Sequence, residues 1–430
     1  MRPVAVIIFH AAAPDDAGPL VRALAEARHA LAERQRVAFL AAGADVAGIV
    51  AGPPDSLSFG GRLAAAVRVR AEGRGTGASP GAVAGAPASG ASPGAGRGAS
   101  SGASPGPSSG ASTGASPGAS PGAVAGAPAS GGLIVLGSGS IPLARAADLR
   151  RFVEVAAGPE GHALANNRYS ADVVAVSRAA DLLDLPPLPA DNALPRWLEE
   201  QAGVAVTDLR SRWRLGVDID TPLDLIVLGE PAGRDLHAAE PLIGERLGER
   251  LGERLGERLA ELGDVLRNRR AELLVAGRVS SATLRWLESG VACRVRALVE
   301  ERGLRAATQL AQSGATTNSR PPRSVLGELL DRDGPVALAQ IAARLADAAV
   351  IDTRVLLAHR HGFTESSWPA AEDRFASDLL APASIADPWL RALTESAATA
   401  PAGHPIILGG HTMMNGGLRL LAQGARAGTR

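Results

Sequence analysis

Two aspartates, Asp218 and Asp220, stand two positions apart in an otherwise apolar stretch. On an extended strand, this spacing points both carboxylates to one face of the sheet. Pro222 then ends the strand and can open a helix that carries Asp224 in its first turn. Paired acids beside a helix start suit a hard divalent cation that carries phosphates. The alternative interpretation is a strand edge with two solvated acids and a helix cap.

His411 is the main candidate for chemistry in the C-terminal half. It lies in a glycine-rich stretch, residues 408–417, directly after an apolar run that predicts a strand. Ligands of open α/β sheets bind at the loops where strands end. A histidine in such a flexible turn could act as a base or hold an oxyanion, while the glycines let backbone N–H groups approach.

Other polar residues of this half have simpler interpretations. The charged residues between 372 and 378 are spaced as one face of a helix, which predicts a solvated face with local ion pairs. Asp352 is expected within an apolar strand. His359 and His361 alternate near the end of that strand, where a surface position and a metal site are the two alternatives.

Composition excludes several classes of function. The 430 residues include 44 basic and 44 acidic side chains, so there is no net positive charge to hold nucleic acid or an acidic membrane. The chain has no lysine, which excludes a Walker lysine and a Schiff-base lysine. Aromatic residues make up 3% of the chain, which argues against base-stacking surfaces for single strands.

Cys293 is the only cysteine, so the chain has neither a disulfide framework nor a cysteine metal cluster. A buried structural thiol and a cytoplasmic location are expected. The apolar run at residues 4–9 is too short to span a membrane and lacks the layout of a signal peptide.

The first half alternates predicted strands and helices, which is typical of an α/β domain with a Rossmann-like, mostly parallel sheet. Apolar runs and helical periodicity predict strands at 4–9, 48–51, 132–137 and 172–177, and helices at 22–39, 57–70, 146–156 and 194–202.

A low-complexity segment at 74–132 consists almost wholly of glycine, alanine, serine and proline. Without large side chains to offset the entropy of ordering, we expect it to be disordered. The strand predicted after it needs the earlier strands as neighbours. The segment is therefore interpreted as an insert within one domain, residues 1–230, either a repeat expansion or a functional tether.

A Gly-Glu-Arg-Leu repeat occupies residues 243–259. Its glycines weaken a helix, so residues 231–265 are expected to be a marginal helical connector, with a coiled-coil arm as the alternative. Residues 266–430 are then a second α/β domain of unknown function. Strands are predicted at 272–277, within 348–358 and at 406–409, and helices at 281–288, 295–302 and 338–345.

Three stretches of the first half carry a resemblance to a known family. Residues 132–143 read GLIVLGSGSIPL, residues 166–174 read NNRYSADVV, and residues 217–225 read VDIDTPLDL. In this order they resemble the nucleotidyltransferase superfamily with a glycosyltransferase-A-like fold, which includes the molybdenum-cofactor and 2-phospholactate guanylyltransferases. There the first stretch ends in acid-x-Pro-Leu, the second lines the acceptor pocket, and the third closes the site.

The resemblance implies transfer of a nucleotidyl group from a nucleoside triphosphate to a small phosphorylated metabolite, aided by Mg²⁺. Asp218 and Asp220 would hold the metal and take part in catalysis. The residues implied near the nucleotide phosphates are Ser138, Gly139 and Ser140, and those implied near the acceptor are Asn166, Asn167, Tyr169 and Ser170.

The chain departs from the family at two places. Ser140 stands where the family has a metal-binding aspartate, and a hydroxyl is a weaker ligand for a hard cation. Residues 10–18 carry two acids instead of the family's phosphate-wrapping glycines, arginine and lysine. These departures indicate a degenerate activity. A second hypothesis is a non-catalytic metabolite-binding or scaffold protein, and a third places the activity around His411.

Overall fold

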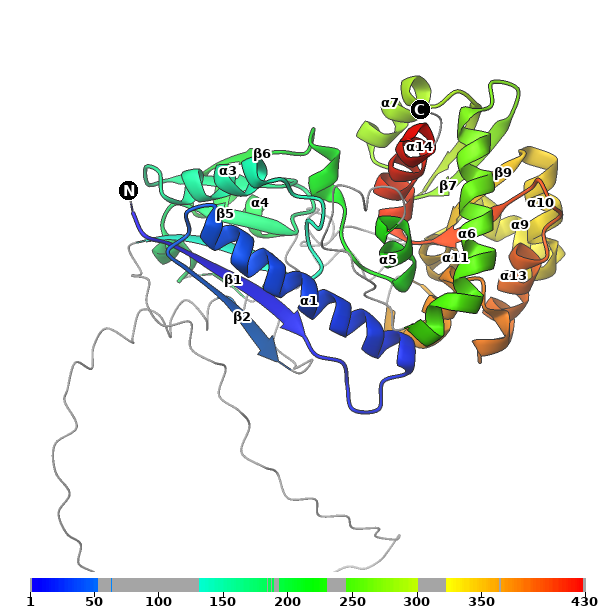
Figure 1. Cartoon of the computed structure of the whole chain (residues 1–430), viewed down its shortest axis with the longest axis horizontal. Coiled ribbons are helices and arrows are strands. Elements are labelled where there is room, and N and C mark those ends of the chain that lie inside the picture. The colour runs from blue at the N-terminus through cyan, green and yellow to red at the C-terminus, as the bar shows by residue number, and fades with distance from the viewer. Residues whose placement is uncertain are drawn as a thin grey trace, which may run out of the picture.

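The structure, a computed structural model, describes residues 2–52, 63, 131–183, 185, 186, 188, 193–229, 245–300, 322–362 and 365–427. These residues form a mixed α/β protein with two sheets rich in parallel strands, one in each half of the chain (Figure 1). The expected α/β class is confirmed at this level. The helix expected at 57–70, apart from Leu63, and the insert, apart from its end, lie outside the described residues.

The first sheet has the strand order β2-β1-β3-β5-β4-β6. Its strands are β1 (Val4–Ala11), β2 (Val46–Gly52), β3 (Gly132–Gly137), β4 (His162–Ala165), β5 (Val173–Val176) and β6 (Ala205–Asp208). β1 pairs in parallel with both β2 and β3, and only β5 runs antiparallel to its neighbours. The strands before and after the insert therefore lie in one sheet, as the sequence predicts.

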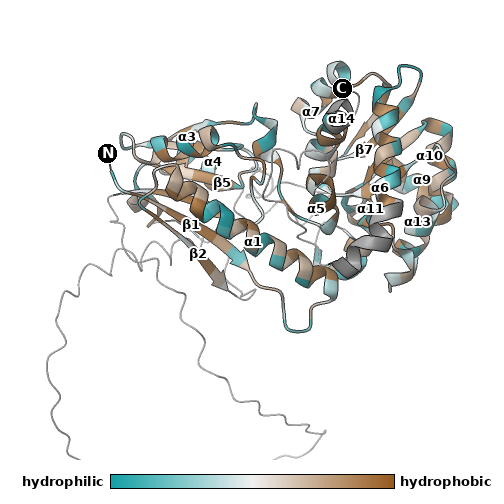
Figure 2. Ribbon diagram, viewed as in Figure 1, coloured by the Kyte–Doolittle hydropathy of each residue, from teal (hydrophilic) through white to brown (hydrophobic). Residues whose placement is uncertain are grey.

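Both faces of the first sheet are covered, because alternate residues of β1 enter two separate hydrophobic cores. Ala5 and Ile7 lie in one core, and Val6 and Ile8 lie in the other. The covering helices are α1 (Pro19–Ala41), α3 (Ala146–Ala156) and α4 (Leu194–Glu200). Figure 2 shows the result as hydrophobic strands beside a helix α1 of mixed character.

The second sheet is wholly parallel and has the order β10-β9-β7-β8. Its strands are β7 (Glu272–Gly277), β8 (Arg294–Val299), β9 (Ala348–Asp352) and β10 (Ile406–Gly409). The helices of this half are α6 (Glu245–Arg267), α7 (Ser281–Gly290), α9 (Val325–Asp333), α10 (Leu338–Leu345), α11 (Thr353–His361), α12 (Ala371–Asp378), α13 (Pro388–Ala398) and α14 (Leu418–Ala427).

The helix predicted at 295–302 is wrong, because this segment forms the edge strand β8. The run Arg-Val-Arg alternates aliphatic and charged side chains, and this period of two suits a strand with one solvated face. Val295 packs against the core, whereas Arg296 is exposed and pairs with Glu272 at 3.1 Å.

Helix α6 contains the four-residue repeat that was expected to form a marginal connector. Its leucines from 255 onward, including Leu259 and Leu266, are buried in the same core as the second sheet. A four-residue period places these leucines along one slowly drifting stripe of the helix. Arg258 also donates to the main-chain oxygen of Ala398 at 2.8 Å. This part of the helix therefore packs as an element of the C-terminal half.

Helices α1 and α5 (Pro222–Gly229) join the two halves through a shared core. Leu20 of α1 and Leu223 of α5 lie in one hydrophobic cluster with the strands of the second sheet. Gly416 approaches Val217 so closely that an added Cβ would lie 2.4 Å from a valine methyl group. The segment that carries the acid pair is thus held between the two sheets.

Candidate functional site

The turn after β3 contacts the segment that carries the acid pair. Ser140 forms an isolated antiparallel bridge with Asp218, and the N–H of Ile219 donates to the main-chain oxygen of Gly139 at 2.8 Å. The structure thus brings together the first and third of the stretches on which the expected resemblance depends, and Val173 and Val174 of the second stretch pair with β3 of the first. Both lie at the edge of the first sheet where the parallel strands β1 and β3 end, which is the edge where open α/β sheets bind ligands.

Gly139 is required by the close approach of these two segments. A Cβ at this position would lie 2.8 Å from the main-chain oxygen of Ile219 and 3.1 Å from Nε of Arg28. The neighbouring Ser140 is buried, and its main-chain oxygen accepts a hydrogen bond from Gln35 of α1. The turn is therefore fixed from two sides.

Asp218 and Asp220 do not share one face of a strand, so this expectation is wrong. The segment makes a single bridge rather than a strand, because Pro222 begins α5 directly after it. Asp218 is half-buried and faces the C-terminal half, where its carboxyl accepts from the hydroxyl of Thr412. Asp220 is exposed and pairs with Arg28 at 3.2 Å.

Electrostatics at Asp218 oppose its ionisation. Burial raises the pKa of the Asp218 carboxyl well above its usual value, and the neighbouring carboxyls of Asp220 and Asp172 raise it further. Asp172 was not predicted as a site residue, because it lies far from the acid pair in the sequence. A carboxyl in this environment gains from a nearby cation.

Asp224 lies in the first turn of α5, as the sequence predicts, and is buried. Its Oδ2 accepts from the N–H of Thr221 at 2.7 Å, from the N–H of Asp220 at 2.9 Å and from the Thr221 hydroxyl at 3.1 Å. Burial, followed by the charge of Asp220, raises the pKa of Asp224 to about 7. Asp224 therefore shapes the turn after the acid pair.

Three basic side chains that sequence reasoning missed lie at the same edge. His10 is the penultimate residue of β1, and its Nδ1 lies 3.1 Å from the hydroxyl of Ser138, the residue that follows β3. The His10 and His29 rings are 5.0 Å apart between centroids, and Nε of Arg28 donates to the main-chain oxygen of Ile219 at 2.6 Å.

Burial lowers the pKa of His10, and the nearby His29 and Arg28 lower it further. The neutral form of this imidazole is therefore favoured. His10 has a usable sequence signal, because it directly follows a buried strand. Arg28 and His29 have none, because polar residues on a long helix give no indication of the neighbour they face.

The residues expected near the acceptor lie in one loop, where the side chains of Asn166 and Asn167 bond to the protein itself. Asn166 is buried and bonded throughout its amide: it donates to Asp172 Oδ2 and to the main-chain oxygen of Leu215, both at 2.7 Å, and accepts from the N–H of Asp172 at 2.9 Å. It therefore fixes the loop. Asn167 accepts from the N–H of Tyr169, whose exposed ring lies 5.5 Å from the guanidinium of Arg210. Ser170 is half-buried in the same loop.

His411 begins a helical segment, so the expectation of a flexible turn is wrong. A π-helical turn (Met413–Gly417) leads directly into α14. Nδ2 of Asn415 lies 3.0 Å from Nδ1 of His411 and donates to the His411 main-chain oxygen at 3.0 Å. Asp352 is the last residue of β9, so it lies in a strand as expected. Its side chain also caps α11, which begins at the next residue.

Several charged residues of the C-terminal half are buried and paired. Burial opposes the ionisation of Asp352, but Arg278, whose Nε lies 2.8 Å away, lowers the pKa of that carboxyl below its usual value. Arg354 pairs with Asp378 through two hydrogen bonds, one of 2.6 Å, and both side chains are buried.

The solvated helix face predicted at 372–378 is therefore wrong, because α12 packs inside the molecule. Asp373 is buried and accepts from the N–H groups of Ala386 and Asp387. His359 and His361 also lie on helix α11 rather than on a strand end. His359 is buried, with Nδ1 accepting from the N–H of Ser324 and Nε2 3.0 Å from Asp331.

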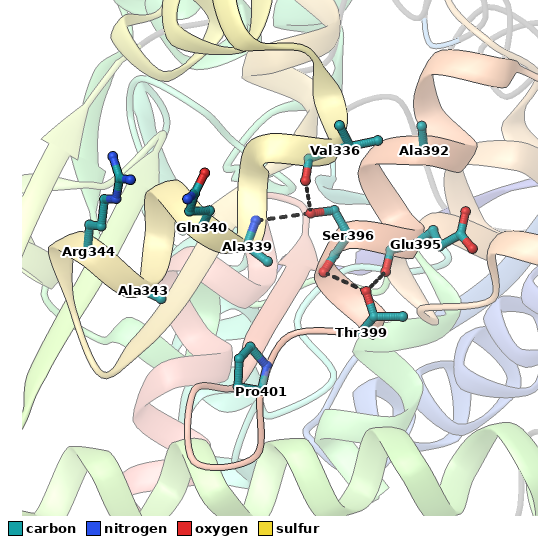
Figure 3. A pocket seen from close by; sticks show the side chains of 10 residues that line it. All are labelled: Val336, Ala339, Gln340, Ala343, Arg344, Ala392, Glu395, Ser396, Thr399 and Pro401. Carbon is teal, nitrogen blue, oxygen red and sulfur yellow. Dashed lines mark hydrogen bonds between the residues drawn. The ribbon is translucent and has the colours of Figure 1, made fainter.

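A groove of about 640 Å³ lies elsewhere, between α10 and α13 (Figure 3). Its lining is mainly apolar, and the hydroxyl of Ser396 bonds to the main chain of Val336 and Ala339. None of the residues predicted to carry chemistry lines it. The groove therefore does not change the assignment of the candidate site.

Within the described residues, no three His, Cys, Asp or Glu side chains are grouped to hold a metal ion. Mg²⁺ is commonly bound by one or two carboxylates together with water and substrate phosphates. Asp218 and Asp220 would supply the carboxylates of this second arrangement, and in the described part of the chain the Asp218 carboxyl is hydrogen-bonded to the hydroxyl of Thr412.

Comparisons of the chain with protein-family models, with curated proteins and with solved structures returned no match. Among the described helices, none is long and apolar enough to cross a membrane.

Proposed function

We propose that the N-terminal half binds a nucleoside triphosphate with a divalent cation and transfers its nucleotidyl group to a small phosphorylated metabolite. The observation that carries this proposal is the bridge between Ser140 and Asp218. It sets the acid pair against the turn that ends β3, where a glycosyltransferase-A-like sheet of this motif order would hold the nucleotide.

Each group at this edge has a role in the proposal. Asp218 and Asp220 would hold Mg²⁺, which when bound neutralises charge that develops on the phosphates. Arg28, His29 and the hydroxyl of Ser138 would donate hydrogen bonds to the phosphates. Basic groups from α1, together with the turn after β3, would thereby replace the missing phosphate loop.

The proposed transfer makes one bond and breaks one. An acceptor phosphate oxygen bonds to the α-phosphorus, while the bond from that phosphorus to the oxygen of the β-phosphate breaks. Pyrophosphate carries the leaving electron pair. The chain's own contribution is the positioning of the triphosphate and the neutralisation of its charge.

Calorimetry with the four common nucleoside triphosphates, with and without magnesium, tests the binding step. We expect heat of binding for at least one nucleotide, with a strong dependence on magnesium that Asp220→Asn abolishes. Release of pyrophosphate from that nucleotide with phosphorylated acceptors then tests transfer. Absence of heat from all four nucleotides would contradict the proposal.

One observation favours the second candidate, a non-catalytic metabolite-binding protein. The carboxylate of Asp220 already has a cationic partner in Arg28, and this ion pair reduces its charge for a metal. Under this candidate, a nucleotide binds without turnover and Asp220→Asn leaves affinity unchanged. The proposal around His411 predicts instead that His411→Ala alone removes ligand binding.

A further inference from the structure

We infer that Thr412, from the C-terminal half, is a positioning residue that holds Asp218 in place for the proposed cation and nucleotide. This inference rests on the proposed function. It assigns to the C-terminal half a part in a site whose other proposed residues belong to the N-terminal half.

The contact is direct and specific. The hydroxyl oxygen of Thr412 lies 3.0 Å from the main-chain oxygen of Asp218 and is also hydrogen-bonded to the Oδ1 atom of the same residue. Thr412 is itself only 1% exposed, so water cannot replace its hydroxyl easily. One side chain therefore constrains both the backbone and the carboxyl group of Asp218.

The position of Thr412 is set by rigid elements on both sides. β10 ends at Gly409, and helical structure begins at His411, so Thr412 lies in the first turn after a buried strand. Met413 and Met414, which follow it, are fully buried. Side chains held by packed elements orient a neighbouring ligand more effectively than side chains of loops.

The surrounding contacts keep the acid segment against this turn. Gly416 packs on Val217, the residue before Asp218, and Gly417 lies near Val227 of α5. An added Cβ at Gly410 would lie 4.0 Å from the Thr221 methyl group, in ordinary contact. Asp218 is thus clamped between the turn after β3 and the turn after β10.

When a residue that hydrogen-bonds to a metal-binding carboxylate is removed, metal affinity typically falls by about 10–100-fold. We therefore expect Thr412→Val, which keeps the branched shape and loses the hydroxyl, to weaken magnesium-dependent nucleotide binding by about that factor. Thr412→Ser, which keeps the hydroxyl, should bind within about threefold of the original protein, a change smaller than that loss.

The matched control is Thr394→Val. Thr394 is fully buried in the same half, and its hydroxyl also makes two hydrogen bonds, to Ser377 and to the main chain of Leu390. This control should lower the melting temperature but leave nucleotide affinity unchanged. Equal losses of affinity in Thr412→Val and Thr394→Val would reduce Thr412 to a structural role and overturn the inference.

The experiment is calorimetry of the full chain with each common nucleoside triphosphate plus magnesium, with thermal unfolding measured in parallel. Binding by the original protein together with unchanged binding by Thr412→Val contradicts the inference alone. No binding by the original protein contradicts the proposed function and the inference with it. If Thr412→Val does not fold, Thr412→Ala is measured in its place. If neither variant folds and Thr412→Ser does, the hydroxyl is needed for folding, and the positioning role is overturned.

Discussion

The carboxylate of Glu372 on α12 accepts the N–H of Leu20, at the beginning of α1, at 2.9 Å. Its second oxygen accepts the N–H of Val21 at 3.2 Å. A residue of the C-terminal half thereby caps the long helix of the N-terminal half, which offers no capping side chain of its own at Gly18. The negative charge also lies at the positive end of the helix dipole.

Glu372→Ala should therefore lower the free energy of unfolding by about 0.5–2 kcal/mol, the usual cost of losing a helix cap. Glu372→Gln keeps an acceptor and should lose less. Urea unfolding measures both, and Glu395→Ala, at an exposed position of α13, is the control. A loss at residue 372 no larger than that of the control would show that the cap contributes nothing.

The buried pair of Arg354 and Asp378 predicts a much larger effect. Asp378→Asn would leave the guanidinium of Arg354 buried without its charge partner, and breaking such a pair costs about 3–5 kcal/mol. The double variant Arg354→Met with Asp378→Leu removes both charges and should recover much of that loss. Denaturant unfolding measures all three proteins, and a loss below about 1 kcal/mol in Asp378→Asn would contradict a desolvated buried pair.

Cys293 should be unreactive in the folded protein. Burial raises the pKa of its thiol to about 11, above the ordinary value of 9.0. Thiol reagents at pH 8 should modify it slowly in buffer and rapidly in urea, because the thiolate is the reactive form. Fast modification without denaturant would contradict a buried thiol.

The same shift predicts a pH dependence of stability. Since the unfolded thiol ionises first, the free energy of unfolding should be unaffected below about pH 9 and fall as the pH rises toward 11. Cys293→Ala is the control and should lack this component. An identical alkaline dependence in both proteins would assign the loss to other groups.

Gly139→Ala tests the contact between the β3 turn and the acid segment. The new Cβ would lie 2.8 Å from the main-chain oxygen of Ile219, so one backbone must move. We expect loss of magnesium-dependent nucleotide binding together with a lower melting temperature. Gly216→Ala is the matched control, because an added Cβ there meets nothing within 4 Å. Nucleotide binding by the Gly139 variant at the level of the control would show that this contact is not needed.

Buried strands were the most predictable part of this fold. The apolar runs that form β1 and β3 are continuous because both faces of the sheet are covered, and this pattern needs no tertiary information. β4 and β6 have four residues each and include polar side chains, so they give no such pattern. In β8 the tertiary environment of a sheet edge prevails over a local pattern that also suits a helix.

The candidate site was predictable only in part, for a related physical reason. The resemblance implied that Ser140 and Asp218 belong to one site, and the bridge between them agrees with that expectation. Arg28 and Thr412 approach the acid pair from distant parts of the chain, and neither has a local signal of its partner. Contacts between a helix face and a distant turn depend on the packing of the whole fold. No local pattern in the sequence therefore predicts them.

The environment of the acids of α12 was also not predictable from local spacing. Glu372, Asp373 and Asp378 have the spacing of a solvated helix face, yet each is bonded to a distant backbone or guanidinium group. Charge spacing along a helix does not report burial when the partners come from other elements.

The central claim is that a cation and a nucleotide bind where the β3 turn meets the acid pair. Paramagnetic broadening of backbone amide signals by Mn²⁺, in the presence of a nucleoside triphosphate, measures this location directly. The account predicts strong, nucleotide-dependent broadening of the Gly139 and Ile219 amides, and its loss in Asp220→Asn. Undiminished signals at both residues, with broadening near His411 or nowhere, would contradict it.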